Sequence, residues 1–404
     1  MKKLFVFISI ILFVFYFKNS ECQWTQVNVG PASLYVGGIT SNTNYLYVSS
    51  LAIGGGMYRS SNNGLNWSAC NSGFYAPFTT CVASRNDTLF AGQSSSSSRF
   101  YFSVDSGASW IMRGLSGWNH NQIFLEANDI YVATSYGLYK TTNIGSNWEL
   151  LIQISGVNTC AKSNNNIYAG TMTFGMRLST NNGVNWISTN NYTTANVKSL
   201  LYYDNMLYGA VYDTGFAVFN HSTLNWGLLN NGLTNKKINV LYRIGNTMFA
   251  CTQGGGVFTA SIGSWVWTQH NEGMINLNIY SVGVKNPYIY LGSDSGKVYK
   301  RLISELVTIK PISSEIPSGF ALYQNYPNPF NPSSNIRYQI ANSSYTTLKI
   351  YDVLGKEVAT LVNEKLQPGT YEVTFGGDNL SSGVYFYQLK TENFTKTKKM
   401  LLVK

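Results

Sequence analysis

The sequence predicts an all-β protein in two parts, and three observations carry this prediction. Tryptophans recur at intervals of about 40 residues, which is the length of one four-stranded propeller blade. Short runs rich in Tyr, Val, Ile and Phe alternate with Asn, Gly and Ser clusters, as strands alternate with turns. No segment beyond the N-terminus has apolar residues at helical spacing. The recurring residues are Trp24, Trp67, Trp110, Trp148, Trp186, Trp226 and Trp267.

The ends of this repeat predict how it closes. Three strand signals follow between Ile279 and Leu302, but no further tryptophan accompanies them. A fourth strand is available at the other end, where Trp24-Thr-Gln-Val stands. Closing the ring with that strand removes the exposed edges of an open array. We therefore expect a seven-bladed β-propeller over residues 23–303.

Four of the tryptophans end a repeated octapeptide: a hydroxyl residue, any residue, Asn or Asp, any residue, Gly, two residues and Trp. An Asn or Asp side chain can bind nearby backbone amides, glycine accepts a positive φ, and the indole can fill the gap between neighbouring hairpins. The pattern resembles the Asp-box (BNR) repeat of sialidase-like propellers, with worn copies ending at Trp226 and Trp267. We expect these residues to be structural: Asn62, Gly64, Trp67, Asp105, Gly107, Trp110, Asn143, Gly145, Trp148, Asn181, Gly183 and Trp186.

The N-terminus predicts export. Lys2 and Lys3 precede an apolar run from Leu4 to Phe17, and small residues follow, so residues 1–22 are predicted to be a signal peptide cleaved after Cys22. A lipoprotein cysteine at Cys22 is the alternative, and the bulky, charged Glu21 before it argues against that. The run is too short for an ordinary membrane span, and no other stretch is apolar enough. An integral membrane protein is not expected.

Cysteine and histidine usage predicts neither disulfides nor a metal site. Cys81 and Cys160 fall in the first strands of two non-adjacent blades, so four buried thiols are favoured over two bridges. The cysteines beyond the leader are Cys70, Cys81, Cys160 and Cys251. The histidines, which stand singly, are His120, His221 and His270. Without ligand clusters, no metal and no cofactor is expected.

The charge of the chain gives little support to a nucleic-acid partner. The formal net charge is +10, but the basic residues of the propeller region are scattered singly among the blades. Nucleic-acid binding normally needs a concentrated positive surface. No nucleic-acid partner is therefore expected.

The composition changes after Leu302. Residues 304–319 carry Pro311, Pro317 and several serines and are predicted to be a linker. From residue 320 to 404 the chain shows six motifs in order, and together they resemble the type A C-terminal sorting domain of type IX secretion. These motifs begin with Leu322-Tyr-Gln-Asn-Tyr-Pro-Asn-Pro-Phe-Asn-Pro332 and include Leu348-Lys-Ile-Tyr-Asp-Val-Leu-Gly355, Leu380-Ser-Ser-Gly-Val-Tyr-Phe-Tyr387 and Lys398-Lys-Met-Leu-Leu402. One departure is Phe375-Gly-Gly377, where the family usually shows Trp-Asp-Gly.

The resemblance implies that type IX machinery recognises this domain, with Gly383, Tyr385, Lys398 and Lys399 as the matching sorting positions. It also implies delivery to the outer-membrane surface or the medium, often with cleavage of the domain. The residues independently predict a small antiparallel, Ig-like β-sandwich, because segments such as Thr347–Val353 alternate apolar and polar side chains. The three prolines of the first motif lack amide donors and are expected outside the sheets.

The candidate ligand face follows from the predicted topology. Boxes in the turn between third and fourth strands leave the opposite face to the loops that link blades and those that join second to third strands. Rings beside Asn, Gln and Arg suit stacking on a sugar or contact with a partner protein. The alternative is that these rings fill space between blades. The candidates are Phe74, Tyr75, Arg113, Trp118, Tyr136, Phe174, Tyr192 and Tyr212.

An enzyme is the second hypothesis, because sialidases resemble this fold. Glycoside hydrolysis usually needs two carboxyl groups at a defined separation, and a sialidase adds an arginine cluster. Acidic residues are scarce, and Tyr242-Arg-Ile-Gly245 resembles the sialidase Phe/Tyr-Arg-Ile-Pro segment but lacks its proline and lies in the sixth blade. We therefore favour a non-catalytic, exported module that binds a glycan or a surface protein, with an extracellular glycoside hydrolase as the alternative.

Overall fold

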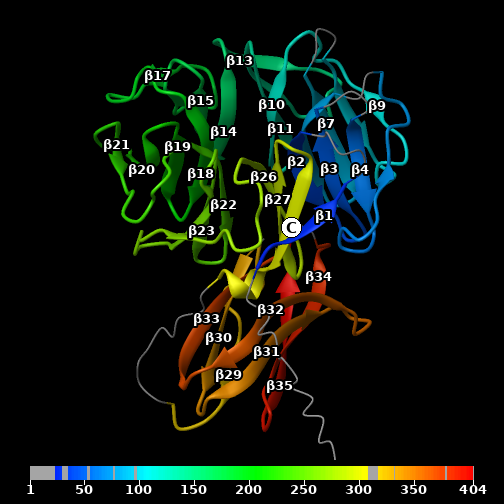
Figure 1. Cartoon of the computed structure of the whole chain (residues 1–404), viewed down its shortest axis with the longest axis vertical. Helices are drawn as coiled ribbons and strands as arrows, with labels where there is room; N and C mark the ends of the chain where they lie inside the picture. Colours follow the sequence, from blue (N-terminus) through cyan, green and yellow to red (C-terminus); the bar gives the residue numbers. More distant parts are fainter. Residues whose placement is uncertain are drawn as a thin grey trace, which may run out of the picture.

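A computed structural model describes residues 23–29, 35–51, 55–75, 78–94, 98–307, 317–331, 333–377 and 380–403. The predicted signal peptide and much of the predicted linker lie outside these ranges. In Figure 1 the sheets of residues 25–302 form a ring, and two further sheets lie below it. The only helix among the described residues is the 3-10 turn η1 (Ile303–Glu305). None of the described helical structure has the length and apolarity to cross a membrane.

Seven four-stranded antiparallel sheets make the ring, and in the first six the strands follow sequence order from the axis outward. The first four blades are β2 (Val36–Ser41), β3 (Leu46–Ser50), β4 (Gly56–Ser60) and β5 (Ser68–Ala69); β6 (Thr79–Arg85), β7 (Thr88–Gln93), β8 (Phe100–Ser103) and β9 (Ile111–Met112); β10 (His120–Glu126), β11 (Asp129–Thr134), β12 (Gly137–Thr141) and β13 (Glu149–Gln153); β14 (Val157–Ser163), β15 (Asn166–Thr171), β16 (Met176–Ser179) and β17 (Ile187–Ser188).

Blades five and six continue the pattern, and the seventh takes its outer strand from the beginning of the chain. These blades are β18 (Val197–Tyr203), β19 (Met206–Val211), β20 (Gly215–Asn220) and β21 (Asn225–Leu228); β22 (Ile238–Ile244), β23 (Thr247–Thr252), β24 (Gly256–Ser261) and β25 (Thr268–Gln269); and β26 (Ile279–Lys285), β27 (Tyr288–Ser293), β28 (Lys297–Leu302) and β1 (Thr25–Asn28).

The ring closes as the sequence predicts. Strand β1 pairs antiparallel with β28, with Thr25 opposite Lys300 and Asn28 opposite Lys297. Trp24 and Leu306, which flank this pair, are both buried in the same cluster of the sixth and seventh blades. Residues just after the last blade thus add to the propeller core. The predicted all-β class, the seven blades and the closure by the strand after Trp24 are confirmed.

The four octapeptides lie between third and fourth strands and share one set of hydrogen bonds. In the first, Gly64 N donates to Ser60 Oγ (2.9 Å) and Asn66 N donates to Asn62 Oδ1 (2.9 Å). The chain turns back through two positive φ angles, 55° at Asn63 and 83° at Gly64. The same bonds recur at Ser103, Thr141 and Ser179. The turn chemistry expected from the motif is therefore present, while the Asp-box family itself stays a prediction.

The box tryptophans join neighbouring blades. Trp110 Nε1 donates to the carbonyl oxygen of Cys70 (2.8 Å) and Trp186 Nε1 to that of Leu151 (2.9 Å), each in or beside the preceding blade's outer strand. Trp226 differs from the expected worn copy, because it lies inside β21 opposite Phe219. There Asn220 Oδ1 accepts from the amides of Ser222 and Thr223 and makes a shorter turn.

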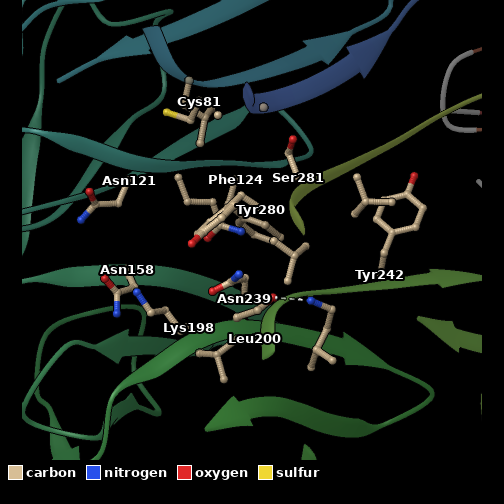
Figure 2. Close-up of a pocket in the computed structure, with 18 of the residues that line it drawn as sticks. Cys81, Asn121, Phe124, Asn158, Lys198, Leu200, Asn239, Tyr242, Tyr280 and Ser281 are labelled. Carbon is tan, nitrogen blue, oxygen red and sulfur yellow. Dashed lines mark hydrogen bonds between the residues drawn. The ribbon is translucent and has the colours of Figure 1, made fainter. Parts of the chain in front are cut away.

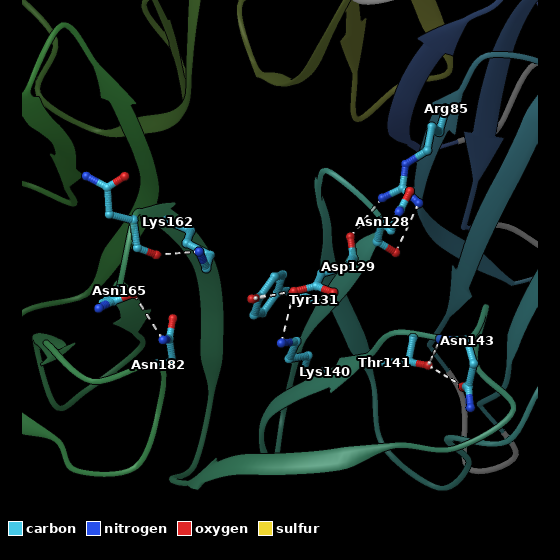
Figure 3. Close-up of polar contacts among 11 residues, drawn as sticks. Arg85, Asn128, Asp129, Tyr131, Lys140, Thr141, Asn143, Lys162, Asn165 and Asn182 are labelled. Atoms are coloured by element: carbon cyan, nitrogen blue, oxygen red, sulfur yellow. Dashed lines mark hydrogen bonds and ion pairs between the residues drawn. The ribbon is translucent and has the colours of Figure 1, made fainter. Parts of the chain in front are cut away.

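Polar contacts also join the blades on the box side of the ring (Figure 3). Arg85 Nη2 donates to the carbonyl oxygen of Asp129 in the next blade (2.8 Å), and the Asp129 carboxylate pairs with Lys140 (2.9 Å). Asn182, in a box turn, donates to Asn165 Oδ1 in the first hairpin of its own blade (3.2 Å). These side chains are committed to holding the hairpins together.

The C-terminal residues form a sandwich of two antiparallel sheets, as predicted. One sheet has the order β29 (Ala321–Leu322), β30 (Ser333–Ile340), β33 (Gly369–Gly376); the other has the order β32 (Glu357–Leu366), β31 (Ser344–Tyr351), β34 (Gly383–Lys390), β35 (Thr395–Leu402). Side chains of β30 alternate between exposed and buried, which fits a strand with one face on the core. Pro327 and Pro329 of the first motif lie outside the strands, and Pro332 falls outside the described residues. Phe330 is buried and its amide donates to Leu401 O (2.9 Å).

The predicted sorting positions lie on the last two strands. Gly383 begins β34, and Tyr385 is buried, with its hydroxyl donating to Ser381 O (2.9 Å). Lys398 is half-buried and Lys399 exposed on β35, which is an edge of its sheet. Lysines on an edge strand discourage pairing with a second chain. Their role in sorting stays a prediction.

All four predicted thiols are free and buried. Burial raises the pKa of the Cys70, Cys81 and Cys251 thiols to about 12 and also raises that of Cys160. Thiols with such pKa values are unreactive near neutral pH. They act as small apolar side chains of the core.

Candidate functional site

One face of the ring carries the loops expected to bind a ligand. Every fourth strand ends there and every first strand begins there, and the loops from second to third strands turn on the same side. The boxes turn on the opposite side. We call the first side the loop face, and all eight predicted ligand-face residues belong to its loops. The structure brings only some of them together.

The clearest aromatic platform on the loop face is a stacked pair. The Trp118 and Tyr136 rings lie with centroids 4.2 Å apart and planes only 13° from parallel. Trp118 precedes β10 and Tyr136 joins β11 to β12, so two loops of the third blade meet here. Trp118 is 39% exposed, which leaves ring surface accessible to a ligand.

Two other predicted aromatics are exposed on separate loops. Phe174, between β15 and β16, is 42% exposed. Tyr75, after β5, is 77% exposed, and the guanidinium of Arg99 lies 5.4 Å from its ring centroid. Exposed rings and guanidinium planes are common at binding surfaces.

Three predicted residues serve packing. Phe74 stacks on Trp110 with centroids 4.8 Å apart, in the core between the first and second blades. The Arg113 guanidinium lies 5.1 Å from the Phe102 ring centroid. Tyr192, at φ 53°, packs against the core of the fourth and fifth blades. These three side chains fill space between or beside the blades, as the alternative interpretation of the aromatic loops expected.

A cavity of about 710 Å³ occupies the axis of the ring and is lined by all seven innermost strands. Figure 2 shows its walls, with Asn121, Asn158, Lys198, Asn239 and Tyr280 on neighbouring strands. Its volume lies within the range of small-molecule sites.

A β-bulge at the second residue of every inner strand shapes the loop-face end of this cavity. The pairing skips one residue in each of the seven strands, and a bulge redirects the side chain that it carries. The seven bulge residues are Gly37, Thr80, Asn121, Asn158, Lys198, Asn239 and Tyr280. They form a ring at equivalent positions, in which three residues are Asn and the other four differ from one another.

Most of the polar bulge residues bind the next blade. Each donates to the carbonyl oxygen of the first residue of the next inner strand. The bonds are Thr80 to His120 (2.6 Å), Asn121 to Val157 (2.7 Å), Asn158 to Val197 (3.1 Å) and Asn239 to Ile279 (2.9 Å). At Gly37 the backbones approach so closely that a Cβ would lie 2.3 Å from Thr80 O. The bulges thus join the inner strands into a continuous wall.

Lys198 departs from this pattern. Its ammonium nitrogen lies 5.5 Å from the ring centroid of Tyr212, and among the described residues it has no carbonyl or carboxylate partner. Burial lowers the pKa of Lys198, because leaving water disfavours the charged form. Tyr212 is fixed in turn by a hydroxyl bond to Gln253 Oε1 (2.5 Å). Among the predicted candidates, Tyr212 thus lies beside a residue of the bulge ring.

Two further tyrosines stand at the same end of the cavity. The Tyr35 and Tyr280 rings lie with centroids 4.9 Å apart, and burial raises the pKa of both phenols. Asp294, nearby, is held by Asn276 (2.8 Å) and Asn278 (3.0 Å). Neutral phenols can donate hydrogen bonds to a ligand.

The acidic residues of the propeller are mostly committed to structure. Asp213 pairs with Lys237 (3.8 Å), and Glu272 pairs with Arg301 (2.9 Å). Asp105 accepts from Ser109 and Ser103 in its box. Among the described cavity-lining residues, Glu126 at the far end of β10 is the only carboxylate. Nor do three potential metal-ligating side chains gather anywhere in the described ranges.

Sequence reasoning missed Lys198, Tyr35 and Tyr280. A lone lysine and two of many tyrosines carry no local motif. Aligning the seven inner strands on their first residue would have shown that Lys198 and Tyr280 occupy one equivalent position.

Comparison with known families identifies the last part of the chain. Residues 324–404 match the family model described as the secretion system C-terminal sorting domain. The chain is thus a β-propeller whose last part matches a type IX C-terminal sorting domain, and this match indicates export to the cell surface or the extracellular space. No curated protein matches the sequence.

Solved structures share the fold at low sequence identity. "YCF48 bound to D1 peptide" has a TM-score of 0.57 at 14% identity, covering 70% of this chain and 97% of that one. PorZ, an essential bacterial surface component of the type IX secretion system of Porphyromonas gingivalis, has a TM-score of 0.53 at 14% identity, covering 94% and 60%. Virginiamycin B lyase from Staphylococcus aureus has a TM-score of 0.59 at 9% identity, covering 70% and 99%. These likenesses show a shared fold.

Proposed function

We propose that this exported propeller is a non-catalytic binding module that holds a glycan on its loop face. A surface protein is the other ligand class that such a face suits. The leader predicted over residues 1–22 would start export, and the sorting domain would complete it. One observation carries the proposal: an open axial cavity lined by amides and tyrosines, with the Trp118–Tyr136 stack on the same face.

The chemistry of this face suits sugars. Stacked aromatic rings present flat apolar faces to the C–H side of a pyranose ring. Amide oxygens and phenol hydroxyls supply the few fixed polar groups that orient a ligand in a site of this size. Trp118 and Tyr136 hold each other in place, so binding would order few side chains.

The glycoside hydrolase alternative has less support. Two carboxyl groups normally flank the bond that is cleaved. Asp213 and Glu272 are engaged in ion pairs, and Glu126 has no acidic neighbour among the described residues that line the cavity.

A glycan array probed with the full chain, followed by a hydrolysis assay on each bound glycan, tests the proposal. We expect binding without product release. Release of reducing ends that Glu126→Gln abolishes would overturn it in favour of a hydrolase. Absence of binding to every glycan, with capture of a surface protein instead, would assign the face to a protein ligand.

A further inference from the structure

The bulge ring presents a specific set of unused polar groups to the cavity. Asn121, Asn158 and Asn239 each use the amide nitrogen to bind the next blade. Their Oδ1 atoms accept no hydrogen bond from any described residue. Lys198 stands at the equivalent position between Asn158 and Asn239, and its ammonium group has no anionic partner in the part of the chain that the structure describes. Four consecutive blades therefore offer three acceptors and one cation.

We propose that the cavity binds the acidic end of a saccharide, with Lys198 contacting the carboxylate of a uronic acid and the three amide oxygens accepting from its hydroxyl groups. This inference rests on the proposed glycan-binding function. A sugar acid can satisfy both the unused amide oxygens and the unpaired ammonium group. Its hydroxyl groups donate to the amide oxygens, and its carboxylate accepts from the ammonium group.

The position of Lys198 explains why it favours an anion. A half-buried ammonium has lost part of its hydration, and the Tyr212 ring face replaces it only partly. An anionic ligand would form an ion pair with the Lys198 ammonium group and so compensate for the lost hydration. Glu126, the one carboxylate among the described residues that line the cavity, is the last residue of β10, five residues along from the bulge at Asn121. At the usual rise of a strand this is about 16 Å away, so Glu126 does not occupy the place of the ligand.

The rings at this end of the cavity would hold the sugar itself. Tyr212 is fixed by Gln253, and Tyr280 packs on Tyr35. Such preordered rings can contact a pyranose without losing further freedom. Asp294, bonded to two asparagines near Tyr35 and Tyr280, would repel a carboxylate placed on that side. The acid group is therefore directed toward Lys198.

Calorimetric titration of the full chain with cellobiouronic acid and with cellobiose tests this assignment, because the two disaccharides differ only in the acid group. We expect tighter binding of the acid, weakened by salt. Lys198→Met keeps the aliphatic stem of the side chain but removes its charge. It should reduce the affinity for cellobiouronic acid about tenfold or more, because a hydrogen bond to a charged group contributes about that much to binding. Cellobiose binding should stay unchanged. Lys236→Met, on an exposed loop of the same face, is the matched control and should change neither.

The outcomes separate this inference from the proposed function. Equal binding of both disaccharides, or an acid preference that survives Lys198→Met, would overturn the inference and leave glycan binding intact. Binding of neither disaccharide nor any array glycan would contradict both. An acidic peptide that binds with Lys198 dependence, when no saccharide does, would replace the acidic sugar with a protein ligand.

Discussion

Trp24 and His270 lie 246 positions apart in the chain, yet Trp24 Nε1 donates a hydrogen bond of 2.8 Å to the carbonyl oxygen of His270. This bond joins the outer strand of the seventh blade to the end of the sixth. Trp24 is 2% exposed and packs in the same cluster as Phe249 and Leu306. This aromatic side chain thus adds a buried contact to the ring closure made by the pairing of β1 with β28.

Trp24→Ala should therefore destabilise the whole propeller. Removing a buried indole costs about 3–5 kcal/mol, and here it also removes the bond to His270. We expect a large drop in the melting temperature, measured by calorimetry. Trp118→Ala, at an exposed loop position, is the matched control and should shift it little. Equal shifts for the two variants would contradict closure through Trp24.

The box turns predict a mild effect of one substitution. Asp105 occupies the position that is Asn in the other three boxes. Desolvation acts against it, but hydrogen bonds from Ser109, Ser103 and Ala108 hold the pKa of Asp105 down to about 2. Asp105→Asn should cost less than about 1 kcal/mol at pH 7, because Asn makes the same turn.

The stability of the wild type and that of Asp105→Asn should respond differently to acid. A depressed carboxyl pKa contributes stability above the unfolded value, and this is lost as the pH falls from about 4 toward 2. Asp105→Asn should therefore lose less stability than the wild type over that window in urea titrations. A steeper loss in the variant would show that the carboxylate does not act through its folded-state pKa.

His120 should make the fold sensitive to mild acid. It is fully buried, its Nδ1 accepts from Gln93 N (3.1 Å), and desolvation lowers the pKa of its imidazole to about 4. The unfolded chain takes up the proton near pH 6.5, so stability is full above that value and falls by about 3 kcal/mol as the pH drops toward 4.

Urea denaturation at pH 7 and at pH 4.5 measures this loss. His120→Asn places an acceptor near Nδ1 and cannot be protonated, so its stability should fall less between the two values. His221 and His270, whose pKa values burial also lowers, would supply the remaining slope. An unchanged slope in the variant would assign the acid sensitivity to other groups.

Removal of residues 383–404 should leave the protein in the periplasm. The deletion takes β34 and β35, which carry the four predicted sorting positions. Surface labelling and cell fractionation measure the result. Because the deletion also disrupts the sandwich, Lys398→Gln with Lys399→Gln tests the edge strand with the core intact. Unchanged surface delivery of the truncated chain would contradict sorting by this domain.

The fold was largely accessible from the sequence, because its signals are local and repeated. The tryptophan spacing predicts the blade count, and the absence of a last outer strand points to Trp24. The boxes predict their own turns, since Asn62 and Gly64 act within a few residues. Trp226 shows the limit of the motif, because a shorter Asx turn at Asn220 replaces the box.

The candidate site was harder to predict from the sequence, because it depends on the β-bulges of the inner strands and on which loops meet in space. Trp118 and Tyr136 were both predicted on the loop face, but their stacking arises from two loops folding together. Lys198 and Tyr280 share a bulge position and no residue type, so only the register of seven strands relates them. Phe74 has the same aromatic character in sequence, and the structure places it between blades.

The most direct test of the account is the affinity of the full chain for its best array glycan, measured with Trp118→Ala and Tyr280→Ala beside the wild type. Binding through the loop face and cavity predicts about fivefold weaker binding or more in each variant, with the melting temperature of Trp118→Ala unchanged, because stacking contributes about 1 kcal/mol or more. Full affinity in both variants would contradict the account, and so would a loss that appears only together with unfolding.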